Sequence, residues 1–193
     1  MNPKTIAPEI KSFDSPKQWR TWLEKNHTNL EGIWLRFFKK ASGVLALGYD
    51  GALDEALCFG WIDGQVKRFD EKSWIQKFTP RRKKSIWSKR NIEHVARLTK
   101  AGEMVEAGLK AFEAAKQDGR LDLAYDSPSN AVVPEDFLNE LSKDKKAKAF
   151  FETLNKSNKY AIVFRLQTAK KPETRERRMS VILKMLANGE KFH

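Results

Sequence analysis

The stretch ALCFGWIDGQVKRFDEKSWIQKFTPRRKKSIW, residues 56–87, contains the pattern that decides the fold. Its aromatic and β-branched residues predict two strands, at residues 61–69 and 73–79, because short runs of this composition fit a pleated sheet. The polar residues between them, DEK at 70–72, are typical of a tight turn. We therefore expect an antiparallel hairpin in the middle of the chain.

A third strand is expected upstream, at about residues 32–39, where the run GIWLRFFK is rich in apolar residues and too short for a convincing helix. Ser15 followed by Pro16 predicts the start of a helix before it. Asp50 is a candidate cap for a short helix that Gly60 ends. Three strands would form a small, mainly antiparallel sheet, and helices packed on it place the chain in the α+β class.

The rest of the chain has the spacing of apolar residues that is typical of helices. After two predicted helices that end near Gly119, residues 121–133 show no sustained period, and we interpret them as a connector. The predicted organisation is thus an α+β domain at residues 1–120 and a helical C-terminal region at residues 134–193.

Positive charge is the most distinctive feature of the composition. The chain of 193 residues has 37 Lys and Arg against 25 Asp and Glu, a net charge of +12. Residues 67–100 contain twelve of the basic residues and only three acidic ones. Because such a concentration attracts phosphates and other anions, we expect an anionic partner, either a small molecule or nucleic acid. The oligomeric state is left open.

The single cysteine, Cys58, has no partner for a disulfide within the chain, which fits a reducing compartment. The opening residues contain no apolar run typical of a signal or anchor, and no segment approaches the length of a membrane span. We therefore predict a cytoplasmic protein without membrane insertion. The sequence has no HExxH, P-loop or GxGxxG motif, so we expect neither a metal nor a cofactor.

The motifs ALCFGWIDG at residues 56–64 and FTPRRKKSIWSKRN at residues 78–91 resemble the signature of the YdeI/OmpD-associated (bacteriocin-protection) family. The resemblance implies a bacterial protein of the type that protects against bacteriocins, antimicrobial peptides and stress. Because the molecular activity of that family is undefined, the resemblance transfers no catalytic residue. Further positions that agree with its pattern are Lys39, Lys40, Gly102, Met104, Pro134 and the segment AKKPETRERR at residues 169–178.

The candidate ligand-binding residues combine cations, aromatic rings and small polar groups. Cations neutralise phosphates, aromatic faces can stack on bases, and a helix that begins after Ser88 offers free amides to an anion. If these groups converge on one concavity, they form an anion site; the alternative for the aromatic rings is a place in the core. The candidates are Lys39, Lys40, Trp61, Asp63, Trp74, Arg81, Arg82, Lys84, Trp87, Ser88 and Arg90.

Asp63 is the candidate catalytic residue, because it lies between Gly60 and Gly64 in a segment poor in charge. A carboxylate there could act as a general acid or base on a phosphorylated or carboxylated substrate. The structural alternative is that Asp63 accepts hydrogen bonds within the fold. The leading hypothesis is a non-enzymatic protein that binds an anionic ligand. An enzyme that uses Asp63 and a non-specific nucleic-acid-binding protein with an extended basic face are the alternatives.

The last predicted helix carries several arginines. Glu173 and Arg177 have the favourable spacing of an ion pair along a helix. Arg175 and Arg178 are interpreted as partners of surface carboxylates, with the closure of an anion pocket as the alternative.

Overall fold

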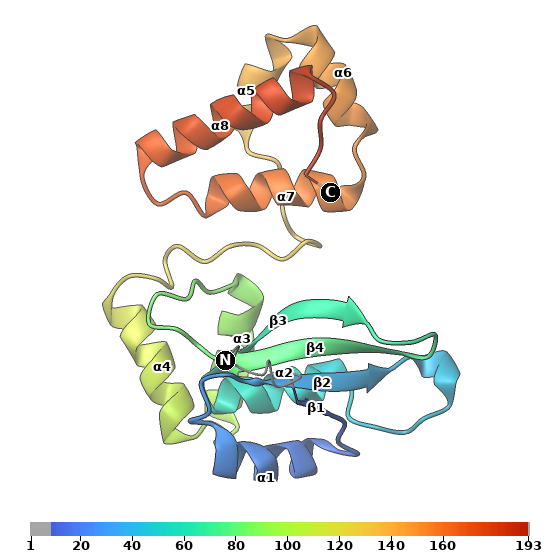
Figure 1. Cartoon of the computed structure of the whole chain (residues 1–193). Helices are drawn as coiled ribbons and strands as arrows, with labels where there is room; N and C mark the ends of the chain where they lie inside the picture. The colour runs from blue at the N-terminus through green and yellow to red at the C-terminus, as the bar shows by residue number, and fades with distance from the viewer. Residues whose placement is uncertain (1–8, 193) are drawn as a thin grey trace, which may run out of the picture. The chain divides into compact units, whose positions relative to one another are not determined.

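The computed structural model describes residues 9–192 (Figure 1). These residues form two compact units. The first contains residues 9–85 together with Asn91–Asp118, and the second contains Ile86–Arg90 together with residues 119–192. None of the described helices is long and apolar enough to cross a membrane.

The first unit is built on a four-stranded sheet with the strand order β1-β2-β4-β3. β2 (Ile33–Phe38), β4 (Ser73–Pro80) and β3 (Trp61–Arg68) pair antiparallel, whereas β1 (Ile10–Lys11) runs parallel to β2. The predicted α+β class and the central hairpin are confirmed. The predicted number of three strands is wrong, because β1 has only two residues and so leaves no alternation in the sequence.

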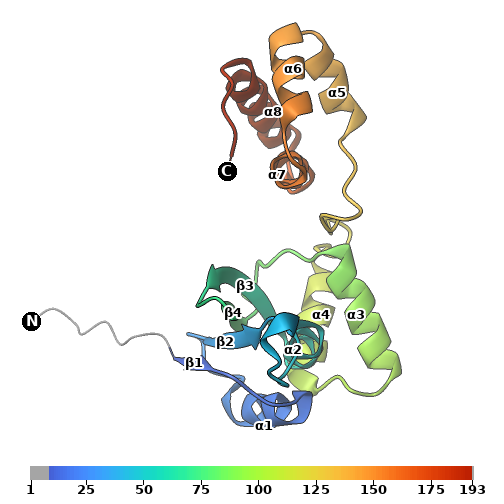
Figure 2. The same ribbon diagram turned by 90° about the vertical axis from the view of Figure 1, so that its right-hand side faces the viewer.

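One face of the sheet forms the core of this unit. Phe37 of β2, Phe78 of β4 and Trp61 of β3 lie on this face, and none is more than 1% exposed. Helix α1 (Pro16–Asn26) covers it, since the ring of Trp19 lies 6.2 Å from Trp61 and 6.0 Å from Phe78, measured between centroids. Figure 2 shows the helices of the unit gathered on one side of the strands.

The observed ends of α1 and α2 agree with the predictions from the sequence, with the exception of Asp50. Ser15 accepts a hydrogen bond from the backbone of Gln18 and caps α1, as predicted. Gly60 has a φ of +73° and follows the end of α2 (Tyr49–Cys58), also as predicted. The assignment of Asp50 as a cap is wrong, because α2 begins at Tyr49 and Asp50 therefore lies in its first turn. A carboxylate in the first turn interacts favourably with the helix dipole.

The first unit also contains the short 3-10 helix η1 (Lys40–Ser42), most of α3 (Lys89–Lys100) and α4 (Glu106–Gln117). Helices α2 and α4 pack closely against each other. A Cβ atom at Gly108 of α4 would lie 2.2 Å from the carbonyl oxygen of Cys58. Only glycine therefore lets α4 approach the end of α2 this closely.

The C-terminal portion is helical, as predicted. It consists of α5 (Glu135–Ser142), α6 (Lys145–Thr153), α7 (Lys156–Gln167) and α8 (Pro172–Ala187), which Figure 1 shows grouped together. Burial of apolar side chains between these helices is the main stabilising contribution. The buried residues of this core are Phe137, Leu141, Ala147, Phe151, Leu154, Ile162, Leu166, Ile182 and Leu186.

The segment Ile86–Arg90 is tied to the second unit by a short parallel bridge. The backbone amide of Tyr125 donates to the carbonyl of Trp87 at 3.1 Å, and the amide of Lys89 donates to the carbonyl of Tyr125 at 2.9 Å. The ammonium group of Lys89 also lies 2.9 Å from the carboxylate of Asp126. The hydrogen bond from Lys89 lowers the pKa of Asp126, so this ion pair is charged at neutral pH.

Candidate functional site

A groove of about 740 Å³ lies in the first unit, where β4 ends and β2 begins. Trp34 and Lys77 are direct partners across β2 and β4, and they belong to the face of the sheet opposite the core. Thr79 follows on the same face of β4. The residues that line the groove are Glu9, Asn29, Leu30, Glu31, Gly32, Trp34, Lys77, Thr79, Pro80, Arg81, Arg82 and Lys83.

Gly32 determines how closely the turn before β2 approaches the end of β4. Its φ is +70°, and a Cβ atom there would lie 2.2 Å from the carbonyl oxygen of Phe78. A residue with a side chain would push the two strands apart. Glycine at this position thus allows the close approach of the two strands where both line the groove.

Four cationic side chains and two carboxylates line the groove. Lys77 is half-buried, whereas Arg82 and Lys83 are exposed. The hydroxyl of Ser85 accepts a hydrogen bond from the amide of Arg82 at 3.0 Å, and this turn holds the basic run beside the groove. Of the two carboxylates, that of Glu9 lies 2.8 Å from the ammonium group of Lys11. Positive charge therefore prevails, and an anion is the favoured ligand.

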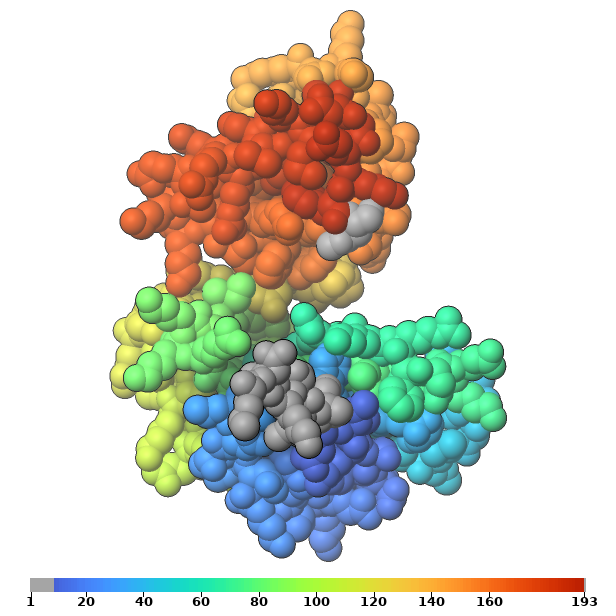
Figure 3. Space-filling view, in the orientation of Figure 1, coloured from blue at the N-terminus to red at the C-terminus, as the bar shows by residue number. Residues whose placement is uncertain are grey.

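The sheet face next to the groove carries aromatic rings with cations over them. The ammonium group of Lys67 lies 4.7 Å from the ring centroid of Trp34. The guanidinium of Arg36 lies 4.7 Å from the Phe38 ring and 4.6 Å from the Phe69 ring. The chain is exposed from Gln65 to Phe69, and Figure 3 shows this part of the first unit at the surface.

Two of the predicted binding residues line the groove. These are Arg81 and Arg82. Lys84 is exposed and follows them in the chain but does not line the groove. Lys39 and Lys40 lie beyond the other end of β2, where the ammonium group of Lys39 donates to the carbonyl of Glu71 at 2.8 Å. The structure therefore does not bring the two lysines together with the basic run.

The predicted tryptophans of the hairpin lie on the core face and not in the groove. Trp61 is 0% exposed, and its indole N–H donates to the carbonyl of His27 at 2.8 Å. Trp74 stacks on Phe37 with 5.5 Å between ring centroids. These contacts agree with the alternative in which the rings are part of the core.

Asp63 is held by two hydrogen bonds within the fold. Its Oδ2 atom accepts one from the hydroxyl of Tyr49 at 2.9 Å and one from the side-chain amide of Gln76 at 2.8 Å. Gln76 is 6% exposed. The lining of the groove does not include Asp63. This geometry agrees with the structural role of Asp63 better than with general acid or base catalysis.

The remaining predicted residues belong to the second unit. Trp87 and Ser88 are buried, and Arg90 is exposed. They lie in the segment that is bonded to Tyr125, so they belong to a different unit from the groove.

Neither a reactive thiol nor a metal centre is found in the described part of the chain. Cys58 is 0% exposed, and burial raises the pKa of its thiol to about 11. A thiol with this pKa is protonated at neutral pH and is a poor nucleophile. Residues 9–192 contain no group of three His, Cys, Asp or Glu side chains arranged to hold a metal ion.

Sequence reasoning missed the residues that complete the groove. Trp34, Lys77 and Thr79 lie on the second face of the sheet. The position of Trp34 could have been predicted from the alternation in β2, because Ile33 and Leu35 lie on the apolar face of the strand and Trp34 between them lies on the opposite face. Lys77 and Thr79 could be found only from the register between the strands.

The fold and the groove thus define an α+β domain with a groove lined by four cationic side chains, followed in the same chain by a helical unit. Comparison with family models gives each part a family. Residues 11–111 match the family described as Domain of unknown function (DUF8412), and residues 130–189 match Bacteriocin-protection, YdeI or OmpD-Associated (OmdA). The chain belongs to the DUF8412 family, and its residues 130–189 are similar to the OmdA family. Neither the curated proteins nor the solved structures yielded a match.

The resemblance to the YdeI/OmpD-associated family is confirmed, and the match falls on the helical part of the chain. It includes Pro134 and the segment at residues 169–178. The motifs at residues 56–64 and 78–91, which first indicated the family, lie within the DUF8412 match.

Proposed function

We propose that this protein is a cytoplasmic protein of the bacteriocin-protection type whose first unit binds a small phosphate-bearing ligand in the groove beside β2 and β4. The OmdA match at residues 130–189 supports the bacteriocin-protection part of the proposal. The observation that carries the binding part is the convergence of Lys77, Arg81, Arg82 and Lys83 on one groove that Trp34 also lines. Cations that meet beside an apolar wall bind a phosphate group and the organic part attached to it.

The carboxylates of the groove favour a small ligand over a polymer. Glu9 and Glu31 line the same groove as the cations. They would repel the regularly spaced phosphates of a nucleic-acid backbone, but they can accept hydrogen bonds from hydroxyl or amine groups of a small molecule. The groove is thus suited to a small ligand that has both phosphate groups and polar donors.

The sheet face beside the groove also favours a small ligand over nucleic acid. Arg36 and Lys67 already lie over rings of the protein, and the guanidinium of Arg36 is 2.7 Å from the carboxylate of Asp70. Rings and cations engaged in this way are less available to stack on bases than the exposed platforms of single-strand-binding proteins. A nucleic-acid-binding protein therefore remains the second candidate function.

Titration calorimetry with ADP and with inorganic pyrophosphate tests the proposal. We expect both ligands to bind at low ionic strength and to bind more weakly as salt is added, because the cations are near the surface. The double variant Arg82→Gln/Lys83→Gln should lose about tenfold or more in affinity, since each cation near a phosphate contributes on the order of 1 kcal/mol even in bulk water.

Lys39→Gln/Lys40→Gln is the matched control, because it removes the same charge at the opposite end of β2. Its affinity should stay close to that of the natural sequence. Equal losses in the two double variants would mean that only net charge attracts the ligand. Affinity for single-stranded oligonucleotides that exceeds affinity for ADP and grows with length would favour the nucleic-acid alternative.

A further inference from the structure

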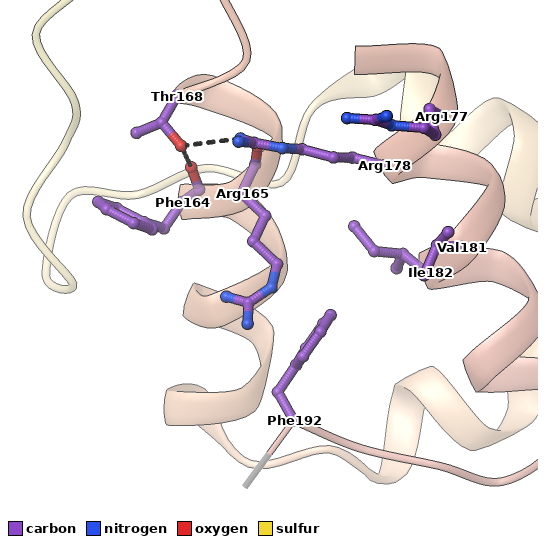
Figure 4. A pocket seen from close by; sticks show the side chains of 8 residues that line it. All are labelled: Phe164, Arg165, Thr168, Arg177, Arg178, Val181, Ile182 and Phe192. Atoms are coloured by element: carbon purple, nitrogen blue, oxygen red, sulfur yellow. Dashed lines mark hydrogen bonds between the residues drawn. The ribbon is translucent and has the colours of Figure 1, made fainter. Parts of the chain in front are cut away.

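A second pocket, of about 370 Å³, lies in the helical unit between α7 and α8 (Figure 4). Four of the residues that line it are apolar. Ile182 is buried at its base, and Val181 is 52% exposed beside it. Phe164 and Phe192 contribute aromatic side chains from α7 and from the segment after α8. The volume is at the lower end of the range for ligand pockets, roughly 300 to 1,000 Å³, and suits a small molecule.

Three arginines surround these apolar walls. Arg178 is fixed, because it donates to the carbonyl of Arg165 at 2.6 Å and to the hydroxyl of Thr168 at 3.2 Å. The guanidinium of Arg165 lies 4.0 Å from the ring centroid of Phe192. Figure 4 shows the side chains of Arg177 and Arg178 both extending from α8 toward α7. The cations and the apolar walls thus belong to one concavity.

The three arginines differ from their neighbour Arg175 in having no carboxylate partner within residues 9–192. Arg175 binds both carboxylate oxygens of Asp136 at 2.8 Å, which confirms its interpretation as a surface-pairing residue. The predicted pair between Glu173 and Arg177 is not formed in the described structure. Because guanidinium groups match carboxylates in geometry, an unneutralised cluster of three is suited to an external anion.

We propose that this pocket binds a small carboxylate with an apolar body, of the kind exemplified by a medium-chain fatty acid. The carboxylate takes a position between Arg165 and Arg177, and the apolar body covers Val181 and packs on Phe192. Burying the exposed apolar surface favours the hydrocarbon part, and the arginines distinguish an anion from a neutral molecule of the same shape. This site lies in the helical unit and is independent of the groove proposed above.

Calorimetric titration of the full chain with octanoate tests the proposal, with octanol and acetate as probes for the apolar body and the charge alone. We expect octanoate to bind with higher affinity than either octanol or acetate. Arg177→Gln should weaken octanoate binding about tenfold, because it removes a charge-assisted hydrogen bond to the carboxylate. Val181→Phe should weaken it similarly, because the larger ring fills the pocket and leaves every charge in place.

Lys184→Gln is the matched control, since Lys184 is an exposed cation of α8 that does not line the pocket. Octanoate affinity should be unchanged in this variant and in Arg82→Gln/Lys83→Gln. The proposal is overturned if octanol or acetate binds as tightly as octanoate, or if Arg177→Gln and Lys184→Gln have the same effect. The variants alter exposed side chains, so circular dichroism should give the same spectrum for each of them as for the natural chain.

Discussion

Replacement of Asp63 distinguishes its structural role from a catalytic one. In Asp63→Ala, the hydroxyl of Tyr49 and the amide of Gln76 lose the oxygen that they share at 2.9 and 2.8 Å. A buried donor left without an acceptor costs about 1 to 3 kcal/mol. Gln76 is 6% exposed and bears this cost, whereas Tyr49 is half-buried and can turn toward water. We therefore expect Asp63→Ala to lower the free energy of unfolding by about 1 to 3 kcal/mol.

Asp63→Asn has the same shape and keeps one side-chain oxygen, which can accept both hydrogen bonds. We expect it to lower the free energy of unfolding by about 1 kcal/mol or less. Urea denaturation followed by tryptophan fluorescence is the assay, because Trp87 is the single tryptophan of the six that belongs to the second unit. The signal therefore reports mainly on the unit that contains Asp63.

Tyr49→Phe provides the control for this series. In its background, Asp63→Ala should cost less than in the natural sequence, because the hydrogen bond between Tyr49 and Asp63 is already absent. The reasoning is refuted if Asp63→Asn destabilises the protein as much as Asp63→Ala does. That result would mean that the negative charge matters more than the hydrogen bonds.

Four further outcomes follow from the geometry. Cys58 should react with a thiol reagent at pH 8 only when the protein unfolds, because its side chain is 0% exposed and burial also raises its pKa to about 11; rapid reaction in the native state would contradict this. Phe137→Ala should destabilise the helical unit by about 3 to 5 kcal/mol and leave the tryptophan-reported transition of the first unit unchanged in a urea titration. Gly32→Ala should both lower stability and weaken ADP binding, since its Cβ would collide with the backbone of β4; calorimetry and denaturation check the two effects. Because pairing with Lys89 lowers the pKa of Asp126, the ion pair stabilises the fold above the usual aspartate pKa and loses this contribution as the pH falls below about 4. An acid titration should show this loss of stability in the natural chain and not in Asp126→Asn.

The main strands could be predicted from the sequence because their alternation reflects the two faces of a sheet. The strands expected at residues 61–69 and 73–79 correspond to Trp61–Arg68 and Ser73–Pro80. β1 could not be predicted, because two residues have no period and its pairing with β2 depends on the folded chain. The association of Ile86–Arg90 with the second unit also had no signal, since it rests on backbone hydrogen bonds to Tyr125.

The positive charge of the candidate site could be predicted from the sequence, but the set of residues that line the groove could not. The concentration of cations near residue 82 was visible in the sequence and lines the groove in part. Which other cations join them depends on strand register: Lys77 pairs with Trp34 at the groove, whereas Lys39 lies beyond the far end of β2. Trp61 was mistaken for a pocket residue because its type fits both stacking on a ligand and burial, and only the packing of α1 decides between them.

A titration of the isotopically labelled chain with ADP, followed by the shifts of backbone amide resonances, tests the central claim most directly. At low salt we predict that the resonances of residues 29–34 and 77–83 shift together in proportion to bound ligand, and that added salt reverses the shifts. Shifts centred on Lys39 and Lys40 or on the neighbourhood of Asp63, with the groove residues unmoved, would contradict the account.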